Sequence, residues 1–314
     1  MYQIMFSLLV HEEPDVILDQ IINLNHFNNN CALVLHLNPK FKFEQYDYTL
    51  EEFTEKINKF GNVFINNQRL EVGKDDIIQA HISNFQFVKK VDFTYFYFIA
   101  SNELFIKEGL YKFISQFEYG CEDLLKEKWH YFDLMQKDPD LKKIIKESGN
   151  ADYSYSQIEG SFYKKELFLT IEDIIARNYD YKKQVGKYPR DEVYFSTIAN
   201  GLYKEQYHYS SCCCKIRWQG KILFTSLGSI KKILKNDSLH YFSVKRVDRR
   251  INDYLRSFVR KTIGQYSDET KKEVKQEVKE ASQIKIKMLN LFYLVKYFFR
   301  NILANMYRFI FRKK

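Results

Sequence analysis

Short apolar runs alternate with longer amphipathic stretches over the first hundred residues of the chain. Residues 2–10 and 31–37 are apolar and rich in β-formers, and residues 15–27 between them repeat apolar side chains at helical spacing. A strand, a helix and a strand of these lengths predict a βαβ unit with parallel strands and a right-handed crossover. A strand at 62–66, a helix at 74–90 and a strand at 93–101 follow in the same way. The pattern therefore predicts an open α/β sheet.

The second half of the chain has a different pattern and no fixed-period repeat. Helical stretches occur between 107 and 148, and a polar loop at 149–168 leads to a predicted helix at 170–180. Another helix is predicted to begin near Pro189 and Asp191, since proline tolerates the first helical turn and acids offset the positive end of the helix dipole. Beyond it we expect a strand pair at 209–226, a helix at 227–237, a strand at 239–244 and an amphipathic helix at 245–264.

Composition indicates a folded protein whose basic character is local. The 314 residues are 45% hydrophobic and 17% aromatic, enough to bury a full core. The formal charge is +9, but residues 281–314 hold eight Lys or Arg and no acid, which leaves 41 basic and 40 acidic residues in 1–280. A nearly neutral body argues against a nucleic-acid partner. We therefore expect a domain at 1–262 and a basic helical extension at 263–314.

The five cysteines do not form a recognisable framework. They stand at positions 31, 121 and 212–214, an odd number with three adjacent and no CxxC pair. We expect small buried thiols in a reducing compartment.

The first residues contain an apolar run without a basic flank or a small-residue cleavage site, so we interpret them as a strand and not as a signal peptide.

Open α/β sheets bind ligands outside the carboxyl ends of their strands. The segments that follow two predicted strands, 36–40 and 101–105, are therefore the first places to seek a site. Neither contains a Gly-rich phosphate loop, and no GxGxxG or Walker pattern occurs in the chain. A dinucleotide enzyme or a nucleoside triphosphatase is accordingly disfavoured.

Several stretches, taken in order, resemble a known family, the core-2 and I-branching N-acetylglucosaminyltransferases. This group also includes peptide-O-xylosyltransferases and bacterial surface-glycan transferases. The resemblance covers about residues 2–256, and the matching stretches are GNVFINNQRLEVGKDDIIQAHISNF, DFTYFYFIASNELFI, EGSFYKKELF, YPRDEVYFSTIA, and IRWQG followed by HYFSVKRVD. Three features depart from the family: Asn102-Glu103 replaces an aspartate, Phe162 replaces a tryptophan, and the cysteine framework of the animal enzymes is absent. The last departure fits a cytoplasmic bacterial relative.

The resemblance implies a GT-A-like fold, an open mixed sheet flanked by helices, and an inverting glycosyltransferase. Such a reaction needs a base for the acceptor hydroxyl and positive charge for the departing diphosphate. Glu192 matches the position of the family's base, and Asp191 beside it is interpreted as the helix cap. A helix N-terminus lowers a carboxyl pKa, whereas burial and the neighbouring Asp191 raise it. The simpler interpretation of both acids, helix capping alone, stays open at this point.

The resemblance also implies metal-free catalysis, in which basic side chains hold the diphosphate. Lys245 matches the family's lysine, and the further candidates for the nucleotide are Arg246, Arg249, Arg217 and His36. A solvated basic helix face is the alternative for these cations, and a structural histidine is the alternative for His36 and for His81.

Candidate contacts to the sugar or the acceptor come from two of the matching stretches. They are Ser101, Glu103, Glu159, Gly160 and Ser161. The chain also holds an Asp-x-Asp sequence at Asp138 and Asp140, the pattern with which many GT-A enzymes bind a metal. It stands between helical runs and follows no strand, so we interpret it as a turn and expect no metal or other cofactor.

The basic tail resembles a surface-bound helix more than a membrane-spanning one. Its longest uncharged run, 288–295, has eight residues, against the roughly 20 needed to cross a bilayer. Lys296, Arg300, Arg308 and Arg312 recur at multiples of four. We expect residues 284–314 to lie on an anionic membrane surface, with a core or dimer helix as the rival.

Together these features predict a glycosyltransferase on the cytoplasmic face of the bacterial inner membrane. We expect it to use a nucleotide-sugar, UDP-linked in our interpretation, and an acceptor in capsule or lipooligosaccharide assembly. One alternative is a transferase of another nucleotide-activated group onto a surface glycan. Another, from a different class, is a non-catalytic membrane-attached glycan-binding protein, in which Glu192 and Lys245 would not share a cleft.

Overall fold

A computed structural model of the chain gives the arrangement of most of its first 262 residues. The residues that the structure describes are 1–68, 70–71, 77–122, 124, 131–180, 188–203, 207–216, 224–262, 288, 291–292 and 295. The predicted basic extension at 263–314 lies almost wholly outside the described residues, as does Arg217. In the described part of the chain no helix is both long and apolar enough to cross a membrane.

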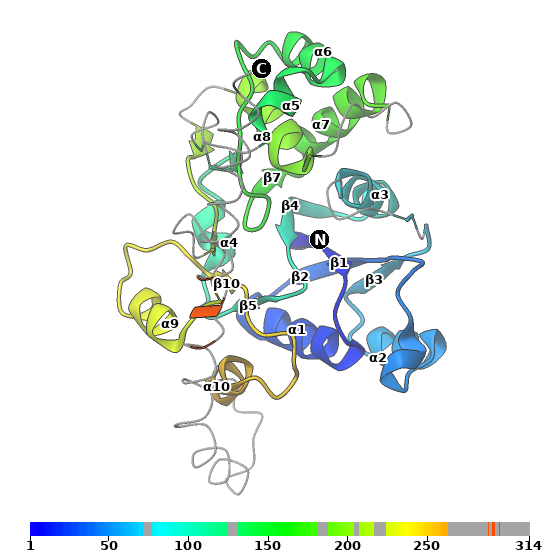
Figure 1. The fold of residues 1–314 in the computed structure, drawn as a ribbon, viewed down its shortest axis with the longest axis vertical. Helices are drawn as coiled ribbons and strands as arrows, with labels where there is room; N and C mark the ends of the chain where they lie inside the picture. The colour runs from blue at the N-terminus through cyan, green and yellow to red at the C-terminus, as the bar shows by residue number, and fades with distance from the viewer. Residues whose placement is uncertain are drawn as a thin grey trace, which may run out of the picture.

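Within the described residues, seven strands form the main sheet, in the order β3-β2-β1-β4-β7-β6-β8 (Figure 1). The first four of these strands are mutually parallel: β1 (Tyr2–Val10) pairs with β2 (Cys31–Leu37) and with β4 (Phe93–Ile99), and β2 pairs with β3 (Val63–Asn66). The other strands are short, and they are β7 (Phe162–Lys164), antiparallel to β4, β6 (Tyr119–Gly120), antiparallel to β7, and β8 (His208–Tyr209), parallel to β6. The expected open, mixed α/β sheet flanked by helices is confirmed.

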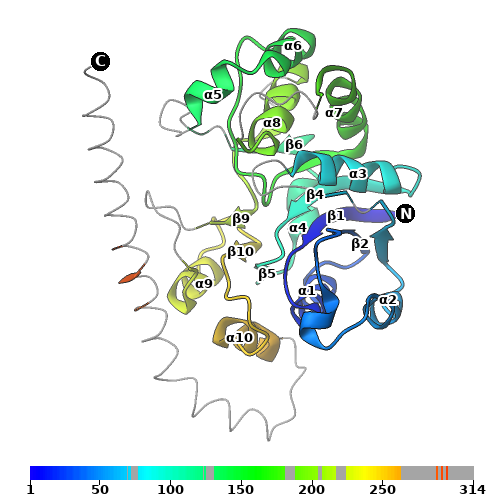
Figure 2. The same ribbon diagram turned by 45° about the vertical axis from the view of Figure 1, so that its right-hand side comes forward.

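Helices cover both faces of this sheet (Figures 1 and 2). On one face lie α1 (Pro14–Phe27) and α2 (Leu50–Asn58), and on the other lie α3 (Ile78–Val88), α7 (Lys165–Asn178) and α8 (Asp191–Leu202). The side chains of β1 alternate between the two faces, as strand geometry requires. Phe6 belongs to the apolar cluster of α1 and α2, whereas the next residue toward the N-terminus, Met5, belongs to that of α3, α7 and α8. The sheet is therefore buried on both sides, which explains its continuous apolar runs.

A smaller sheet lies beside the carboxyl end of β4. It contains β5 (Glu103–Phe105), β10 (Ser243–Lys245) and β9 (Cys214–Lys215), with β10 between an antiparallel and a parallel neighbour. Its central strand thereby brings residue 245 next to the end of β4. The remaining described elements are η1 (Phe43–Tyr46), α4 (Leu110–Ile114), α5 (Phe132–Gln136), α6 (Pro139–Ser148), α9 (Leu227–Leu234) and α10 (Tyr254–Thr262).

Two expectations for the second half of the chain are wrong. The helix predicted at 245–264 begins only at Tyr254, because Lys245 ends strand β10 and Arg246 has a left-handed backbone with φ 69°. The helical stretches predicted between 107 and 148 are present as α4, α5 and α6, with the short strand β6 between α4 and α5. Of the strand pair predicted at 209–226, β9 pairs with β10 instead, and 217–223 lie outside the described residues.

The Asp-x-Asp sequence has a structural explanation. Asp138 is the N-cap of α6, and its carboxylate accepts from the backbone N–H groups of residues 140 and 141. The same buried carboxylate accepts from Tyr188 Oη at 2.6 Å and Tyr194 Oη at 2.8 Å, and it pairs with buried Arg190 at 3.2 Å. Arg190 also occupies the N-cap position of α8, so Asp191 is the first helical residue and not the cap that we expected. Asp138 thus ties the start of α8 to α6.

The cysteines are buried and free, as expected. The backbone of Cys213 and Cys214 closes over Gly160, and the Cys213 N–H donates to the Gly160 carbonyl at 2.9 Å. Gly160 has φ +83°, and a Cβ at this position would lie 2.3 Å from the nitrogen of Cys214. Only glycine fits both requirements. The turn 158–161 is therefore fixed against β4, where Gly160 N donates to Phe98 O and Phe98 N donates to Ser161 O.

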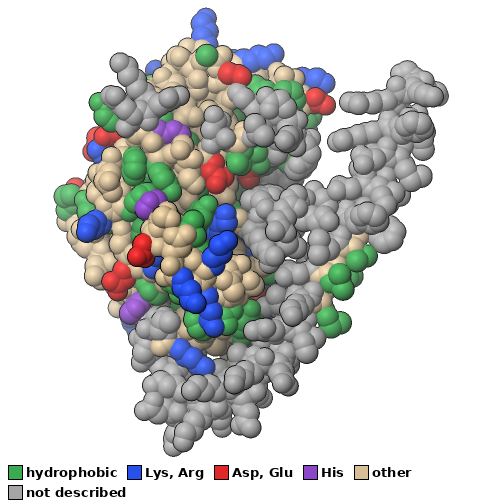
Figure 3. Space-filling view, turned by 90° about the vertical axis from the view of Figure 1, so that its left-hand side faces the viewer, with side chains coloured by type: hydrophobic (Ala, Val, Ile, Leu, Met, Phe, Trp, Pro, Cys, Tyr) green, Lys and Arg blue, Asp and Glu red, His purple; other side chains and the backbone are tan. Residues whose placement is uncertain are grey.

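The surface of the described body is not uniformly neutral. On the face that carries α4 and α9, Lys and Arg side chains gather in a stripe (Figure 3). Helix α9 exposes Lys231, Lys232 and Lys235. The body therefore carries local basic surface, although residues 1–280 have almost no net charge.

Candidate active site

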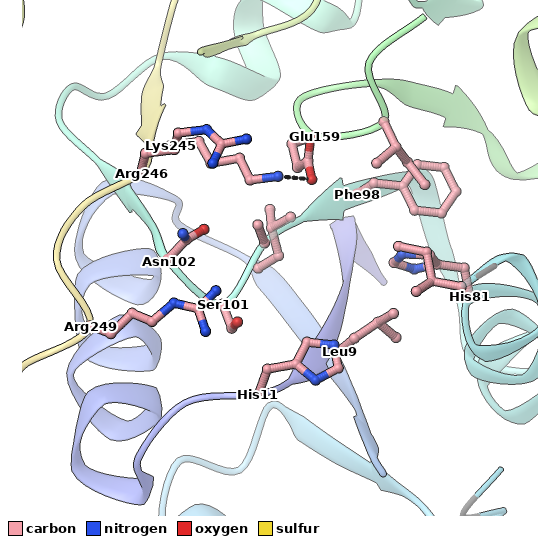
Figure 4. Close-up of a pocket in the computed structure, with 14 residues that line it drawn as sticks. Leu9, His11, His81, Phe98, Ser101, Asn102, Glu159, Lys245, Arg246 and Arg249 are labelled. Atoms are coloured by element: carbon pink, nitrogen blue, oxygen red, sulfur yellow. Dashed lines mark hydrogen bonds and ion pairs between the residues drawn. The ribbon is translucent and has the colours of Figure 1, made fainter. Parts of the chain in front are cut away.

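A cavity of about 190 Å³ opens at the carboxyl ends of β1 and β4. The chain proceeds outward from β1 through β2 to β3 and then returns to the other side of β1 with β4. The two central strands therefore meet at a topological switch point, where open α/β sheets bind their ligands. The 14 residues that line the cavity (Figure 4) are Leu9, His11, Ile77, His81, Phe98, Ile99, Ala100, Ser101, Asn102, Ile158, Glu159, Lys245, Arg246 and Arg249.

One wall of the cavity is cationic. Lys245 ends strand β10, and Arg246 and Arg249 follow it on the loop toward α10. The small sheet places this wall, because Lys245 pairs with residue 103 just beyond β4 and Val247 N donates to Asn102 O at 3.2 Å. Three of the predicted diphosphate-binding residues are thereby brought together. Arg217 lies outside the described residues.

Arg246 combines an unusual backbone with an unusual side chain. Its φ of 69° is rare for a residue other than Gly, Asn or Asp and is the kind of strain found at binding sites. Its backbone carbonyl accepts from Thr225 N at 3.1 Å, which stabilises this conformation. Its Nε is buried and has no hydrogen-bond partner among the described residues, and burial lowers the pKa of the guanidinium. Arg246 is thus a partly desolvated donor at the cavity.

Glu159 projects into the same cavity and forms an ion pair with the Nζ of Lys245. Both side chains are mostly shielded from water, with exposed fractions of 13% and 16%. Gln157 holds the turn beneath them, since its Nε2 donates to the carbonyls of Glu159 at 2.7 Å and of Cys214 at 3.0 Å. The acid from the β4–β7 side and the cation from the small sheet therefore meet inside the cavity.

Glu192, the predicted base, lies next to the Glu159 end of the cavity without lining it. The first turn of α8 packs on the strand-like segment before the turn, where Ser156 N donates to Glu192 O at 2.9 Å and Ser154 N donates to the Thr197 hydroxyl at 2.9 Å. Tyr155 hydrogen-bonds the Glu192 carboxyl, and the charges of Glu159 and Lys245 both act on it. The acid at 192 and the cation at 245 thus belong to one electrostatic cluster.

The pKa of Glu192 is raised well above its ordinary value of 4.5. Burial of the carboxyl is the main cause, the charges of Asp191 and Glu159 add to it, and Lys245 and the Tyr155 hydrogen bond oppose it. Burial therefore outweighs the N-terminus of α8, which alone would favour the carboxylate. A carboxylate with a raised pKa is a stronger base than an ordinary glutamate.

Glu12 binds two residues at the mouth of the cavity. Its buried carboxylate accepts from the Ser101 hydroxyl at 3.1 Å and pairs with Arg249 Nε at 3.2 Å. Glu12 follows β1, Ser101 follows β4, and Arg249 follows β10. One carboxylate thereby joins the ends of three strands.

The opposite wall is uncharged and partly aromatic. Nδ1 of His81, on α3, is hydrogen-bonded to Ser7 Oγ at 2.8 Å, and the His81 ring packs edge-on against Phe98. Burial lowers the pKa of His81 to about 3, so the ring is neutral. His36, predicted as a nucleotide contact, is fully buried on β2 and does not line the cavity.

The predicted sugar contacts divide into two groups. Ser101 and Glu159 line the cavity, whereas Glu103, Gly160 and Ser161 do not. Glu103 is buried beneath it, where its carboxylate accepts from Ala100 N at 3.0 Å and from the Ser243 hydroxyl. Burial raises the pKa of Glu103 to about 7. The hydroxyl of Ser161 donates to Ile158 O at 2.6 Å within the turn.

Sequence reasoning did not find His11 or Glu12, and it named Asn102 only as a departure from the family within segment 101–105. The segments examined after predicted strands were 36–40 and 101–105, and the second of these does reach the cavity. Residues 11 and 12 follow the first strand in the same way. Their importance depends on β1 and β4 being neighbours, and strand order is not visible in the pattern of apolar residues.

Comparisons with known proteins add little to this geometry. No protein-family model matches the sequence. No curated protein matches it either. Among solved structures, the crystal structure of the galactosyltransferase LgtC with donor and acceptor sugar analogues matches at 11% identity and a TM-score of 0.39, covering 84% of this chain and 98% of that chain. An active-site mutant of LgtC matches at 9% identity and a TM-score of 0.38, with the same coverage. Likeness at this level is too distant to define the fold or the activity of this chain.

Proposed function

We propose that this chain is a glycosyltransferase that moves a sugar from a nucleotide-sugar donor to a glycan acceptor, with inversion at the anomeric carbon. The observation that carries the proposal is the meeting of a three-cation wall with the Glu159 and Glu192 carboxyls at the switch point of an α/β sheet. The resemblance to the core-2 and I-branching transferases supports the same assignment through the positions of Glu192 and Lys245.

In the proposed reaction the acceptor oxygen attacks the anomeric carbon while the bond from that carbon to the diphosphate breaks. Glu192 takes the hydroxyl proton, and Lys245, Arg246 and Arg249 hold the charge of the departing diphosphate. Arginine and lysine can supply this charge without a metal. The positions of Ser101 and Asn102 at the end of β4 suit contacts to the sugar, since both line the cavity.

The setting of the reaction is proposed from the sequence alone. We propose a UDP-linked donor, an acceptor in bacterial capsule or lipooligosaccharide assembly, and a position on the cytoplasmic face of the inner membrane through residues 284–314. The basic character of that segment, with eight Lys or Arg and no acid from 281 onward, favours an anionic lipid surface.

A panel of nucleotides and nucleotide-sugars, first in thermal shift and then in hydrolysis with and without EDTA, tests the function. We expect a nucleoside diphosphate to raise Tm and its sugar ester to be hydrolysed in EDTA. Glu192→Gln should retain binding and lose about 10²- to 10⁴-fold of the rate. Lys245→Met should weaken binding, whereas Lys231→Met, which removes an exposed lysine of α9, should not. Failure of every nucleotide to bind would favour a non-catalytic protein.

A further inference from the structure

The Lys245–Glu159 ion pair lies inside the cavity, at the end of the cationic wall formed by β10. Lys245 is the only cation of that wall for which a partner inside the cavity is seen among the described residues, since Arg249 pairs with Glu12 at the mouth. Both members of the pair line the cavity, so any anion that binds Lys245 must compete with Glu159.

We propose that the Glu159 carboxylate contacts Lys245 where a phosphate of the donor binds, and that the phosphate displaces Glu159 from Lys245 on binding. This inference rests on the proposed function and deepens it. Glu159 keeps the lysine extended into the cavity and prevents an uncompensated, largely dehydrated charge while no donor is bound. The Lys245–Glu159 contact thereby marks where one phosphate of the donor binds.

The surroundings of Glu159 allow its ion pair with Lys245 to break. The Nε of Arg246 lies buried at the same cavity without a partner among the described residues; burial lowers the pKa of that arginine, and the charge of Glu159 opposes this effect. The carboxylate therefore keeps a positive neighbour after the exchange. A phosphate carries more charge and more acceptor oxygens than a carboxylate, so it competes well for an ammonium group.

The fixed backbone of the turn confines the exchange to the side chain. Gly160 is held between β4 and the Cys213–Cys214 backbone, and the Glu159 carbonyl accepts from Gln157. Substitution of the carboxylate therefore leaves the main-chain contacts of residue 159 unchanged. The charged or titratable groups that act on or with Glu159 come from β5, β9, β10, α8 and the adjoining loops, and they are Lys245, Arg246, Glu192, Glu103, Cys214 and Tyr155.

A double-mutant cycle on inorganic pyrophosphate binding, measured by calorimetry on the full chain, tests the exchange. Glu159→Gln should bind pyrophosphate more tightly than the wild type, by about 3- to 10-fold, because a mostly shielded competing ion pair is removed. In a Lys245→Met background the same substitution should change affinity by less than about twofold. Glu159→Ala should behave as Glu159→Gln does, and melting curves should show all five proteins folded.

Two outcomes would overturn the inference, and they are distinguishable from each other. If Glu159→Gln tightens binding equally with and without Lys245, the acid acts only through its general field and not by holding the lysine. If Glu159→Gln weakens binding or leaves it unchanged, the pair is not a competitor of the anion. Absence of pyrophosphate and nucleotide binding in the wild type would overturn the proposed function as well.

Discussion

Glu12 and Arg249 form an ion pair across the mouth of the cavity, with Oε1 of the acid 3.2 Å from Nε of the arginine. The two members differ sharply in environment, since 3% of the Glu12 side chain is exposed and 64% of the Arg249 side chain is. An exposed arginine on a loop is mobile and costs side-chain entropy when a ligand orders it. The buried partner therefore fixes the direction of Arg249 before any ligand arrives.

Glu12→Gln should weaken donor binding without slowing the chemical step. The amide keeps an oxygen for Ser101 but loses the charge that orients Arg249, so we expect KM for the donor to rise about 3- to 10-fold with kcat nearly unchanged. Steady-state kinetics measure both constants. Glu13→Gln, which removes the same charge from the next residue outside the cavity, is the matched control. An equal fall in kcat and in kcat/KM would show instead that Glu12 acts in the transition state.

Burial makes the Glu192 carboxylate more basic and lowers the stability of the folded protein at high pH. Its folded-state pKa is raised above the ordinary value of 4.5, so its stabilising contribution is complete below about pH 4.5 and is lost as pH rises through the raised value. At pH 8, Glu192→Gln should therefore melt at a higher temperature than the wild type. Each kcal/mol gained in the free energy of unfolding raises Tm by about 2–4 °C. Near pH 4.5 the two proteins should melt at the same temperature. Paired melting curves at both pH values check this. A lower Tm for the variant at pH 8 would contradict the assignment of a desolvated carboxyl.

Strands β1, β2 and β4 are predictable from sequence because burial on both faces gives continuous apolar runs. Strands of two or three residues, such as Tyr119–Gly120, carry no such signal, and the pairing that creates them is tertiary. The start of α10 differs from the prediction for a related reason. Residues 245–253 have a helical pattern of charge, but pairing of Lys245 with Glu103 and the left-handed backbone of Arg246 make the segment extended and then looped.

The candidate site was predictable only where a motif marks it. Lys245 and Ser101, which stand in matching stretches, line the cavity, and Glu192 lies beside it without lining it. Glu103 has the same motif support yet is buried below the cavity, because the chain turns after Ser101 and begins β5. Glu12 was missed, since its role arises from the adjacency of β1 and β4 and from a loop more than 200 residues away.

Gly160→Ala should destabilise the protein severely, because the turn that carries Glu159 has no room for a side chain. The positive φ costs an alanine about 1–2 kcal/mol, and contact with Cys214 N at 2.3 Å adds a steric cost, for a total of about 2–5 kcal/mol. Gly61→Ala is the matched control, since Gly61 has φ +70° and nothing within 4 Å of the added Cβ. Urea denaturation of both variants separates the steric cost from the backbone cost. Equal losses for the two glycines would contradict the packing described for the turn.

Asp138 should matter for folding and not for binding a metal. Asp138→Ala removes the cap of α6 and leaves Arg190 buried without its carboxylate, so we expect a loss of about 3–5 kcal/mol in the free energy of unfolding. Asp140→Asn should cost less than about 1 kcal/mol, since that carboxylate pairs with exposed Lys143. Urea titration and initial rates measure the two effects. A metal site at this sequence would behave differently, with activity lost in both variants while their stability stayed close to that of the wild type.

Glu103 should make stability depend on pH near neutrality. Its pKa is raised from 4.5 to about 7, mainly by burial, so its contribution to stability is complete below about pH 4.5 and is lost as pH rises to about 7. Glu103→Gln keeps an acceptor for Ala100 N and a polar partner for Ser243, and it cannot ionise. The difference in unfolding free energy between the variant and the wild type should therefore increase by about 3 kcal/mol in favour of the variant from pH 4.5 to pH 8. Glu55→Gln, at an exposed position on α2, should show no such change. Urea titrations across this range decide the matter, because a constant difference between variant and wild type would mean that the pKa of Glu103 is not raised in the folded protein.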